Sequence, residues 1–159
     1  MFEGISGAQF SPCRKYRYAL WRKWDPRGSA MLFIGMNPST ADETRDDQTI
    51  RKCAGYAKRW GYGGLVVGNL FALCSSDPFK VLTAQKKAMG NPENDEVLAE
   101  MAKATTFTLV GWGRLGEYQR RHEAVLAILG TVHCLKVTKN GQPQHPLYLP
   151  YYLEPQEYK

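Results

Sequence analysis

The hydrophobic and polar positions along the chain follow two patterns, which predict strands and helices in turn. Short apolar runs without polar interruption are typical of strands covered on both faces. Such runs predict strands at 30–35, 65–71 and 106–113, and TVHCLKVT at 131–138 predicts a last one. Apolar residues at helical spacing predict helices that start at Asp47 or Gln48 and end at Gly61, that run from Glu93 to Lys103, and that cover 117–129.

The segment CRKYRYALWRKW at 13–24 alternates bulky and basic residues and is followed by DPRG. Pro26 suits the second position of a turn and Gly28 its exit. The pattern therefore predicts a β-hairpin whose second strand is 30–35. The stretch SSDPFKVLTAQKKAMGNPENDEV at 75–97 predicts a long loop leading into the second helix. The predicted order of elements is ββαβαβαβ.

Strands that alternate with helices indicate right-handed crossovers and a mainly parallel sheet. We therefore expect an α/β fold, a three-layer α/β/α sandwich with a mainly parallel four-stranded central sheet plus an N-terminal β-hairpin strand. At 159 residues, 43% of them hydrophobic, the chain is long enough for one domain with its own core. The expected domain is the whole of residues 1–159.

Composition and charge narrow the partners and the compartment. The chain has 21 Lys and Arg against 15 Asp and Glu, a net charge of +6, which favours an anionic partner such as nucleic acid. Four widely spaced cysteines and no signal peptide are typical of a reduced cytoplasmic protein. No apolar run has the length of a membrane span, so we expect a soluble chain. We also expect it to be cytoplasmic and a monomer. Scattered histidines and an acidic run without a calcium-loop pattern predict no metal, and we expect no cofactor.

The loops that follow the carboxyl ends of parallel strands converge on one crevice. The predicted loops of this kind are GMNPSTADE at 35–43, NLFALCSSDP at 69–78, GWGRLG at 111–116 and TKNGQPQHPLYL at 138–149. All four are polar or glycine-rich, and glycines such as Gly113 let the backbone approach a ligand closely. The topology therefore predicts a functional site at this edge of the sheet.

Three side chains of these loops are candidates for chemistry, and each has a structural alternative. Asn37 can position a water or bind a base edge, or it can complete an Asx-turn. Asn69 can pair its amide with a nucleobase edge, or it can satisfy neighbouring backbone groups. His145 can donate a hydrogen bond to an oxygen that gains negative charge, or it can be a structural histidine.

The acidic stretch TADETRDDQTIRKC at 40–53 divides into two parts. Asp46 and Asp47 lie where a predicted helix begins, and helix capping and the helix dipole explain both carboxylates. Asp42 and Glu43 precede the predicted helix. One of these two carboxylates could therefore reach the crevice and activate a water.

Motifs over nearly the entire chain resemble a family of uncharacterised bacterial and phage proteins, a domain of unknown function: YRYALWRKW, GMNPSTADETRDDQTIRKC, WGYGGLVVGNLFAL, SSDP, GNPENDEVL, GWG and TKNGQPQHPLYL. The order of the loop motifs also resembles the uracil-DNA glycosylase superfamily. In that superfamily a Gly-X-X-Pro loop follows the first core strand and a His-Pro loop follows the last. GMNPS is similar to the first loop and QHPLYL to the second.

The second resemblance implies that Asn37 positions the attacking water, that Asn69 reads the base and that His145 stabilises the departing base. The most active uracil enzymes carry an Asp in the first loop, where this chain has Met36 and Asn37. Leu147 stands where the serine of their His-Pro-Ser loop would be. These differences favour a modified or damaged base as the target.

The expected function is that of a DNA glycosylase-like enzyme that hydrolyses the N-glycosidic bond of such a base. Residues expected around the base are Met36, Pro38, Ser39, Asn69, Phe71 and Gly113. Basic residues expected to grip phosphates are Arg14, Lys15, Arg17, Arg22, Lys23 and Lys139. Two alternatives are a non-catalytic nucleic-acid-binding module of the same fold, and a nucleotide- or base-modification enzyme of phage DNA metabolism or defence.

Overall fold

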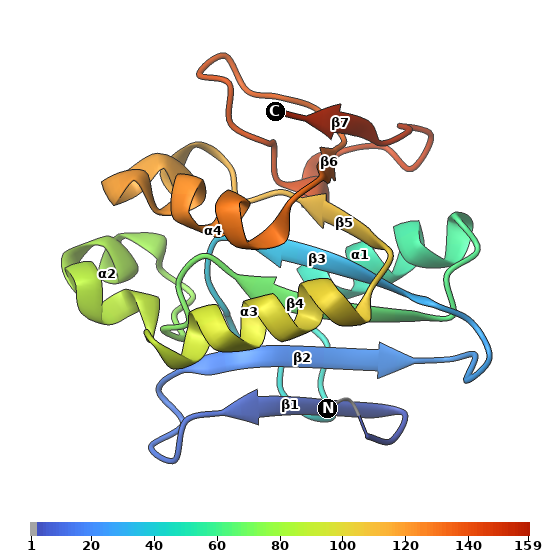
Figure 1. Cartoon of the computed structure of the whole chain (residues 1–159), viewed down its shortest axis with the longest axis horizontal. Helices are drawn as coiled ribbons and strands as arrows, with labels where there is room; N and C mark the ends of the chain where they lie inside the picture. Colours follow the sequence, from blue (N-terminus) through green and yellow to red (C-terminus); the bar gives the residue numbers. More distant parts are fainter. Residues whose placement is uncertain (1–2) are drawn as a thin grey trace.

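The computed structural model describes residues 3–159 and contains a seven-stranded mixed sheet with helices on both faces (Figure 1). The strands are β1 Ser6–Phe10, β2 Arg17–Lys23, β3 Ala30–Gly35, β4 Gly64–Asn69, β5 Phe107–Val110, β6 Val132–Cys134 and β7 Gln156–Tyr158. Their order across the sheet is β1-β2-β4-β3-β5-β6-β7. β3 pairs in parallel with β4 and β5, and β5 with β6, whereas β1, β2 and β7 pair antiparallel. The α/β class is confirmed, with a larger and more mixed sheet than predicted.

The predicted β-hairpin is wrong, because β2 and β3 are not neighbours in the sheet. β4 lies between them, antiparallel to β2 and parallel to β3. The turn after β2 contacts the residues just before β4, because the N–H groups of Trp24 and Asp25 both donate to the carbonyl of Gly63. A Cβ on Gly28 would come within 2.7 Å of the Gly63 Cα, so the crossing requires glycine.

Several short elements lie where the residue pattern predicts none. β1 and β7 are short and have no clear alternation of apolar residues. The predicted loop at 75–97 contains the helix α2, Pro78–Thr83, and the 3-10 helix η1, Gln85–Met89. The carboxylate of Asp77 caps α2 by accepting a hydrogen bond from the N–H of Phe79. Elements this short bury too few residues for a period to be recognised.

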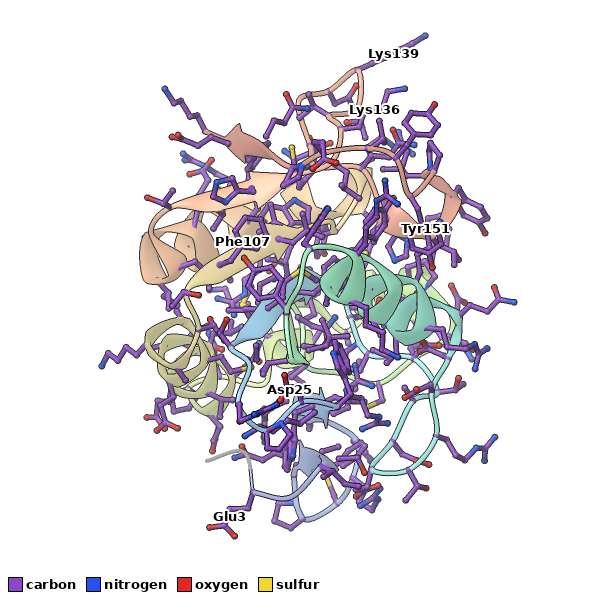
Figure 2. The ribbon with its side chains drawn as sticks, turned by 90° about the vertical axis from the view of Figure 1, so that its right-hand side faces the viewer. Glu3, Asp25, Phe107, Lys136, Lys139 and Tyr151 are labelled. Carbon is purple, nitrogen blue, oxygen red and sulfur yellow. The ribbon has the colours of Figure 1, made fainter. Side chains whose placement is uncertain are left out.

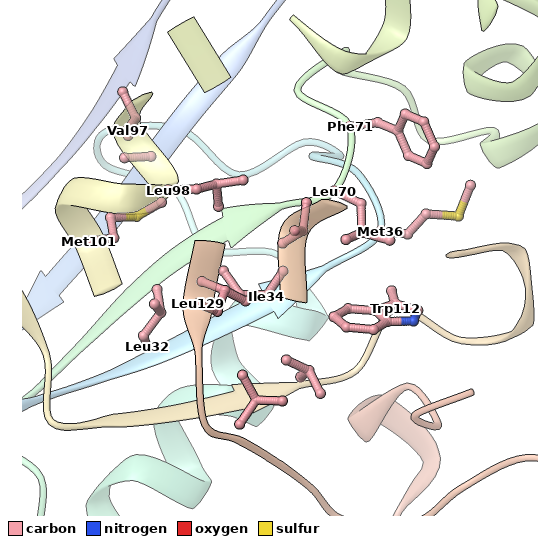
Figure 3. Packing of buried hydrophobic residues seen from close by; sticks show 14 of the residues in the cluster. Leu32, Ile34, Met36, Leu70, Phe71, Val97, Leu98, Met101, Trp112 and Leu129 are labelled. Carbon is pink, nitrogen blue, oxygen red and sulfur yellow. The ribbon is translucent and has the colours of Figure 1, made fainter. Parts of the chain in front are cut away.

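Three longer helices correspond to the predicted ones: α1 Gln48–Arg59, α3 Glu93–Ala104 and α4 Arg121–Leu129. The third begins later than the predicted 117, because the 3-10 helix η2, Arg114–Arg120, and a kink at Tyr118 and Gln119 precede it. α1 packs Ile50 against Phe33 on one face of the sheet. α3 and α4 pack Leu98 and Leu129 around Ile34 on the other face, which is the front in Figure 1 and is enlarged in Figure 3. In the described part of the chain, no helix is long and apolar enough to cross a membrane.

The segment after β6 is anchored to α1. It contains the 3-10 helix η3, Pro146–Tyr148. The hydroxyl of Tyr56 on α1 is shared between the carbonyl oxygens of Leu149 and Pro150, at 3.2 Å and 2.9 Å. The rings of Tyr56 and Tyr151 lie with their centroids 4.9 Å apart, and Tyr151 is labelled in Figure 2. These contacts hold the His-Pro loop against the carboxyl edge of the sheet.

Candidate functional site

A cavity of about 340 Å³ opens at the carboxyl ends of β3, β4 and β5. The structure brings together seven of the residues expected in the site as part of its lining: Arg17, Met36, Asn37, Ser39, Asn69, Gly113 and His145. They come from β2, from the end of β4 and from the loops after β3, β5 and β6. The loops expected to converge therefore do meet around one cavity.

Other residues expected in the site lie outside the lining of this cavity. Pro38 is buried beside it, and Phe71 is fully buried in the core under α3 and α4. Lys15, Lys23 and Lys139 are exposed on the surface. Lys139 projects from the segment after β6 in Figure 2. These lysines can contact a long ligand only outside the cavity.

Asp42 and Glu43 also lie outside the lining and are engaged locally. The Asp42 carboxylate accepts hydrogen bonds from the N–H groups of Thr44 and Arg45 at 2.9 Å and 2.8 Å, and these bonds lower its pKa. Glu43 forms a two-bond ion pair with Arg14, which lowers the pKa of Glu43. Neither carboxylate is placed to activate a water in the cavity.

Arg22 ties the same acidic loop to β2. Its Nε lies 2.8 Å from Asp46 Oδ1, and its Nη2 donates to the carbonyl of Asp42 at 2.7 Å. The basic side chains of Arg14 and Arg22 thus balance the charge of the acidic loop and fix its course. Both guanidinium groups make contacts within the protein, and that of Arg14 remains exposed.

Asn37 joins two of the loops and leaves one atom free. Its Nδ2 donates to the carbonyl oxygens of Pro38 at 2.9 Å and of Ser75 at 2.8 Å, so both amide hydrogens are used. No donor among residues 3–159 hydrogen-bonds to its Oδ1. The side chain therefore has the structural role and also offers an acceptor that can hold a water.

Asn69 is fixed from the opposite side by Arg17. The Oδ1 of Asn69 lies 3.4 Å from Nη2 of Arg17, which can only donate, so the amide orientation is defined. Asn69 is 4% exposed, and its Nδ2 lies beside Gly35, where a Cβ would come within 3.0 Å. The free donor of Asn69 thus occupies space that a side chain at position 35 would fill.

A buried polar network supports the backbone at the end of β4. Asn94 is fully buried, and its Nδ2 donates to the carbonyl oxygens of Asn69 and Leu70 at 3.2 Å and 3.3 Å. Nε of Arg121 donates to the same Leu70 carbonyl at 2.8 Å, and its Nη2 pairs with Asp95. Side chains of α3 and α4 therefore hold the strand end that carries Asn69.

His145 is held as a neutral donor. Its Nδ1 accepts a hydrogen bond from the N–H of Leu147 at 3.2 Å, so the ring proton is on Nε2. Burial lowers the pKa of His145 below its usual value of 6.5, and the negative charge of Asp47 opposes this shift with a smaller effect. A neutral imidazole at pH 7 can donate from Nε2 to an oxygen or nitrogen that becomes negative.

Asp47 is a cavity residue that the sequence pattern assigns only to a helix cap. Its Oδ1 does cap α1, accepting from the N–H of Ile50 at 2.9 Å. It is also the only Asp or Glu in the cavity lining, among the residues that the structure describes. Its position could have been foreseen, because a helix that follows a parallel strand begins at the same edge as the crevice.

The remaining lining consists of apolar walls and small polar side chains. Phe33 and Trp112 border the cavity but are only 1% and 2% exposed, and Nε1 of Trp112 donates to Oε1 of Gln142 at 2.8 Å. Further lining residues outside the expected set include Thr49, Ser75, Ser76, Pro78 and Arg114. No group of three or more His, Cys, Asp or Glu side chains within residues 3–159 is arranged to hold a metal ion.

Residues 17–147 match a protein family described as a protein of unknown function, DUF1643. The chain belongs to the DUF1643 family. The resemblance to an uncharacterised domain family is therefore confirmed. Comparisons with curated proteins and with solved structures give no significant match, so the resemblance to uracil-DNA glycosylases stays a prediction.

The region shared with the DUF1643 family begins at Arg17 and ends at Leu147, so it includes every residue that lines the cavity. In this DUF1643 chain, the cavity combines a carboxylate, a free amide oxygen, a free amide donor and a neutral imidazole. Such a set can hold a flat polar ring, position a water and stabilise a leaving group that becomes negative.

Proposed function

We propose that the chain is a DNA glycosylase-like enzyme that hydrolyses the N-glycosidic bond of a modified or damaged base. The observation that carries this proposal is that Asp47, Asn37, Asn69 and His145 line one cavity. Cleavage of a base from its sugar creates positive charge on the sugar and negative charge on the base. The cavity offers groups suited to each charge.

The proposed roles follow from the free atoms of these side chains. The Oδ1 of Asn37 and the carboxylate of Asp47 hold the attacking water, and the carboxylate accepts its proton as the oxygen bonds to C1′ of the sugar. The bond between C1′ and the base nitrogen breaks, and its electron pair leaves with the base. Nε2 of His145 donates to the departing base, and Nδ2 of Asn69 donates to its edge.

The arrangement of the sheet supports this proposal without deciding the activity. We interpret the parallel strands β4, β3, β5 and β6 as the sheet of a uracil-DNA glycosylase-like fold, to which three antiparallel strands are added. The cavity lies at the carboxyl ends of these strands, where ligands bind in open α/β sheets. A base in DNA would have to leave the helix to enter the cavity.

The test is an excision assay on single-stranded and duplex DNA that carries a panel of modified bases, followed by alkaline cleavage at abasic sites. The matched variants are Asp47→Asn and His145→Gln, with Glu43→Gln as the control outside the cavity. Asparagine caps helices as well as aspartate does, so Asp47→Asn removes the base without removing the cap. We expect Asp47→Asn to lower the rate by about 100-fold or more.

Two results would contradict the proposal. If the chain cleaves none of the panel but binds DNA in a salt-sensitive way, it is a non-catalytic nucleic-acid-binding module. If it binds no DNA and consumes a free nucleotide, it is a nucleotide- or base-modification enzyme. Full activity of Asp47→Asn and His145→Gln would remove these residues from the mechanism, whatever the substrate.

A further inference from the structure

Arg17 is a buried cation without a carboxylate partner. It is 3% exposed, lies on β2 and contributes to the cavity lining. Nη1 donates to the carbonyl of Ala41 at 2.9 Å, and Nη2 lies 3.4 Å from Oδ1 of Asn69, but Nε has no hydrogen-bond partner. Within the described residues, no Asp or Glu oxygen lies within 4.0 Å of its nitrogens. The guanidinium has therefore lost its contacts with water, and protein groups do not replace all of them.

Burial of the Arg17 guanidinium costs free energy, and its two hydrogen bonds within the protein do not fully recover that cost. A buried charge is ordinarily paired, since its loss of hydration is otherwise uncompensated. Arg121, on the other face of the sheet, shows the ordinary solution, because its guanidinium pairs with Asp95 and donates to the Leu70 carbonyl. Arg17 has only two neutral oxygens. A ligand that brings acceptors or negative charge would complete its environment.

Arg17 also determines what Asn69 presents to the cavity. Because the guanidinium occupies Oδ1 of Asn69, the amide offers its Nδ2 hydrogens and not its oxygen. A free asparagine amide would offer a donor and an acceptor side by side. The floor formed by Arg17 and Asn69 thus consists of donors only, and a ligand edge that carries an amino group would face donor against donor.

We propose that Arg17 makes the cavity selective for a base whose edge carries carbonyl acceptors without an exocyclic amino group, and that it holds this base as an anion after departure. This inference rests on the proposed function, in that the ligand is a nucleobase. The positive charge of Arg17 would then lie where the negative charge of the departing base develops. Arg17 is accordingly assigned to the base, and not to the phosphates of the DNA backbone.

A phosphate group is the less suitable occupant of this floor. Asp47 lines the same cavity, and its charge offsets part of the attraction of Arg17 and Arg114 for a doubly charged phosphate. Phe33 and Trp112 border the cavity, and an apolar border suits a flat ring better than a charged tetrahedral group.

The experiment measures binding of free bases to the full chain by calorimetry, which requires no bond cleavage. Two matched pairs, uracil against cytosine and hypoxanthine against adenine, exchange a carbonyl for an amino group and the neighbouring ring N–H for a ring nitrogen that accepts. We expect the carbonyl member to bind about 10-fold tighter or more, the effect of one charged hydrogen bond. Xanthine, which loses a ring proton near neutral pH, should bind more tightly at pH 8.5 than at pH 6.

Variants test whether Arg17 and Asn69 cause these binding preferences. Arg17→Met should abolish the pH effect and reduce the carbonyl preference, whereas Lys23→Met, an exposed change on the same strand, should alter neither. Because the loss of a buried arginine can disturb folding, Asn69→Asp gives a second test. The new carboxylate pairs with Arg17 and presents an acceptor to the cavity, so the preference should reverse toward cytosine.

Equal affinity for both members of each pair, or an unchanged preference in Asn69→Asp, would overturn the inference. Inorganic phosphate could also compete with the bases in the parent and no longer compete in Arg17→Met. That result would overturn the inference too, because it would show that Arg17 binds phosphate. Selective base binding without any excision would instead leave this inference standing and reject the proposed enzyme. Excision confined to amino-bearing bases would support the enzyme and reject the role of Arg17.

Discussion

The carboxylate of Asp47 accepts a hydrogen bond from the N–H of Ile50 at 2.9 Å while it lines the cavity. One side chain thus begins helix α1 and provides the acid group of the candidate site. A helix cap needs only an oxygen acceptor, whereas a general base must be able to take up a proton. Substitution by asparagine can therefore separate the two roles.

Asp47→Ala should lose both roles, and Asp47→Asn only one. We expect Asp47→Ala to lower the free energy of unfolding by about 1 kcal/mol through loss of the cap, and Asp47→Asn to stay close to the parent. Urea denaturation followed by circular dichroism measures both. Equal destabilisation by the two variants would show that the charge, and not the cap, stabilises the start of α1.

The unfolding free energy should fall as the pH falls from 7 to 5. Burial keeps the pKa of His145 below its usual 6.5 in the folded chain, so the unfolded chain binds more protons in this range. The contribution is complete above pH 6.5 and is lost as the pH falls from that value through the lower pKa of the folded chain. A protonated Nδ1 also cannot accept the Leu147 N–H. Urea titrations of the parent and of His145→Asn should differ in this pH dependence.

Gly35→Ala should weaken base binding more than it weakens the fold. The new Cβ would approach Nδ2 of Asn69 to 3.0 Å and the ring of Phe33 to 3.3 Å, in the space where the free donor of Asn69 lies. We expect about a 10-fold loss of affinity for a bound base. Gly64→Ala is the control, because its Cβ meets the carbonyl of Arg22 at a similar 3.0 Å but away from this cavity.

Arg121→Met should destabilise the end of β4. It removes a side chain that is 3% exposed, leaves the partner Asp95 unpaired and deprives the Leu70 carbonyl of a donor. Breaking a buried pair of this kind costs about 3 kcal/mol. The urea midpoint reports the loss, and hydrogen exchange of the amides in β4 should rise. An unchanged midpoint would contradict the support assigned to this network.

Glu43→Gln and Asp42→Asn should leave excision or base binding unchanged. Both carboxylates lie outside the cavity lining, and Glu43 forms its ion pair with Arg14 at the surface. Kinetics or calorimetry on the two variants checks this expectation. A 100-fold loss in either variant would transfer the role of general base from Asp47 to the acidic loop.

The elements that could be predicted are those with a strong period or an uninterrupted apolar run. α1 has Ile50, Cys53, Tyr56 and Ala57 on its buried face, and β4 is buried at every position. The pairing of β2 could not be predicted in the same way, because a turn signal such as DPRG shows that the chain reverses and not which strand lies next to it. β1 and β7 depend on pairing with neighbours rather than on their own sequence.

The site was predictable to the level of its loops. Asn37, Asn69 and His145 follow strands, and topology alone places them at one edge. The position of Asp47 in the cavity was not predicted, because helix capping already explained an aspartate at the start of α1. Arg17 belongs to a segment rich in arginine and lysine, and nothing in CRKYRYALWRKW distinguishes the one guanidinium that is buried from those that reach the surface.

The insertion of β4 between β2 and β3 has a consequence for the chemistry of the cavity. In the hairpin expected from the turn signal, Arg17 would lie beside β3 and away from Asn69. In the observed order, β2 runs along β4, and the N–H of Arg17 donates to the carbonyl of Ala72 just beyond the end of β4. The strand order thus places Arg17 beside the strand that ends in Asn69, and the ligand preference we propose depends on that pairing.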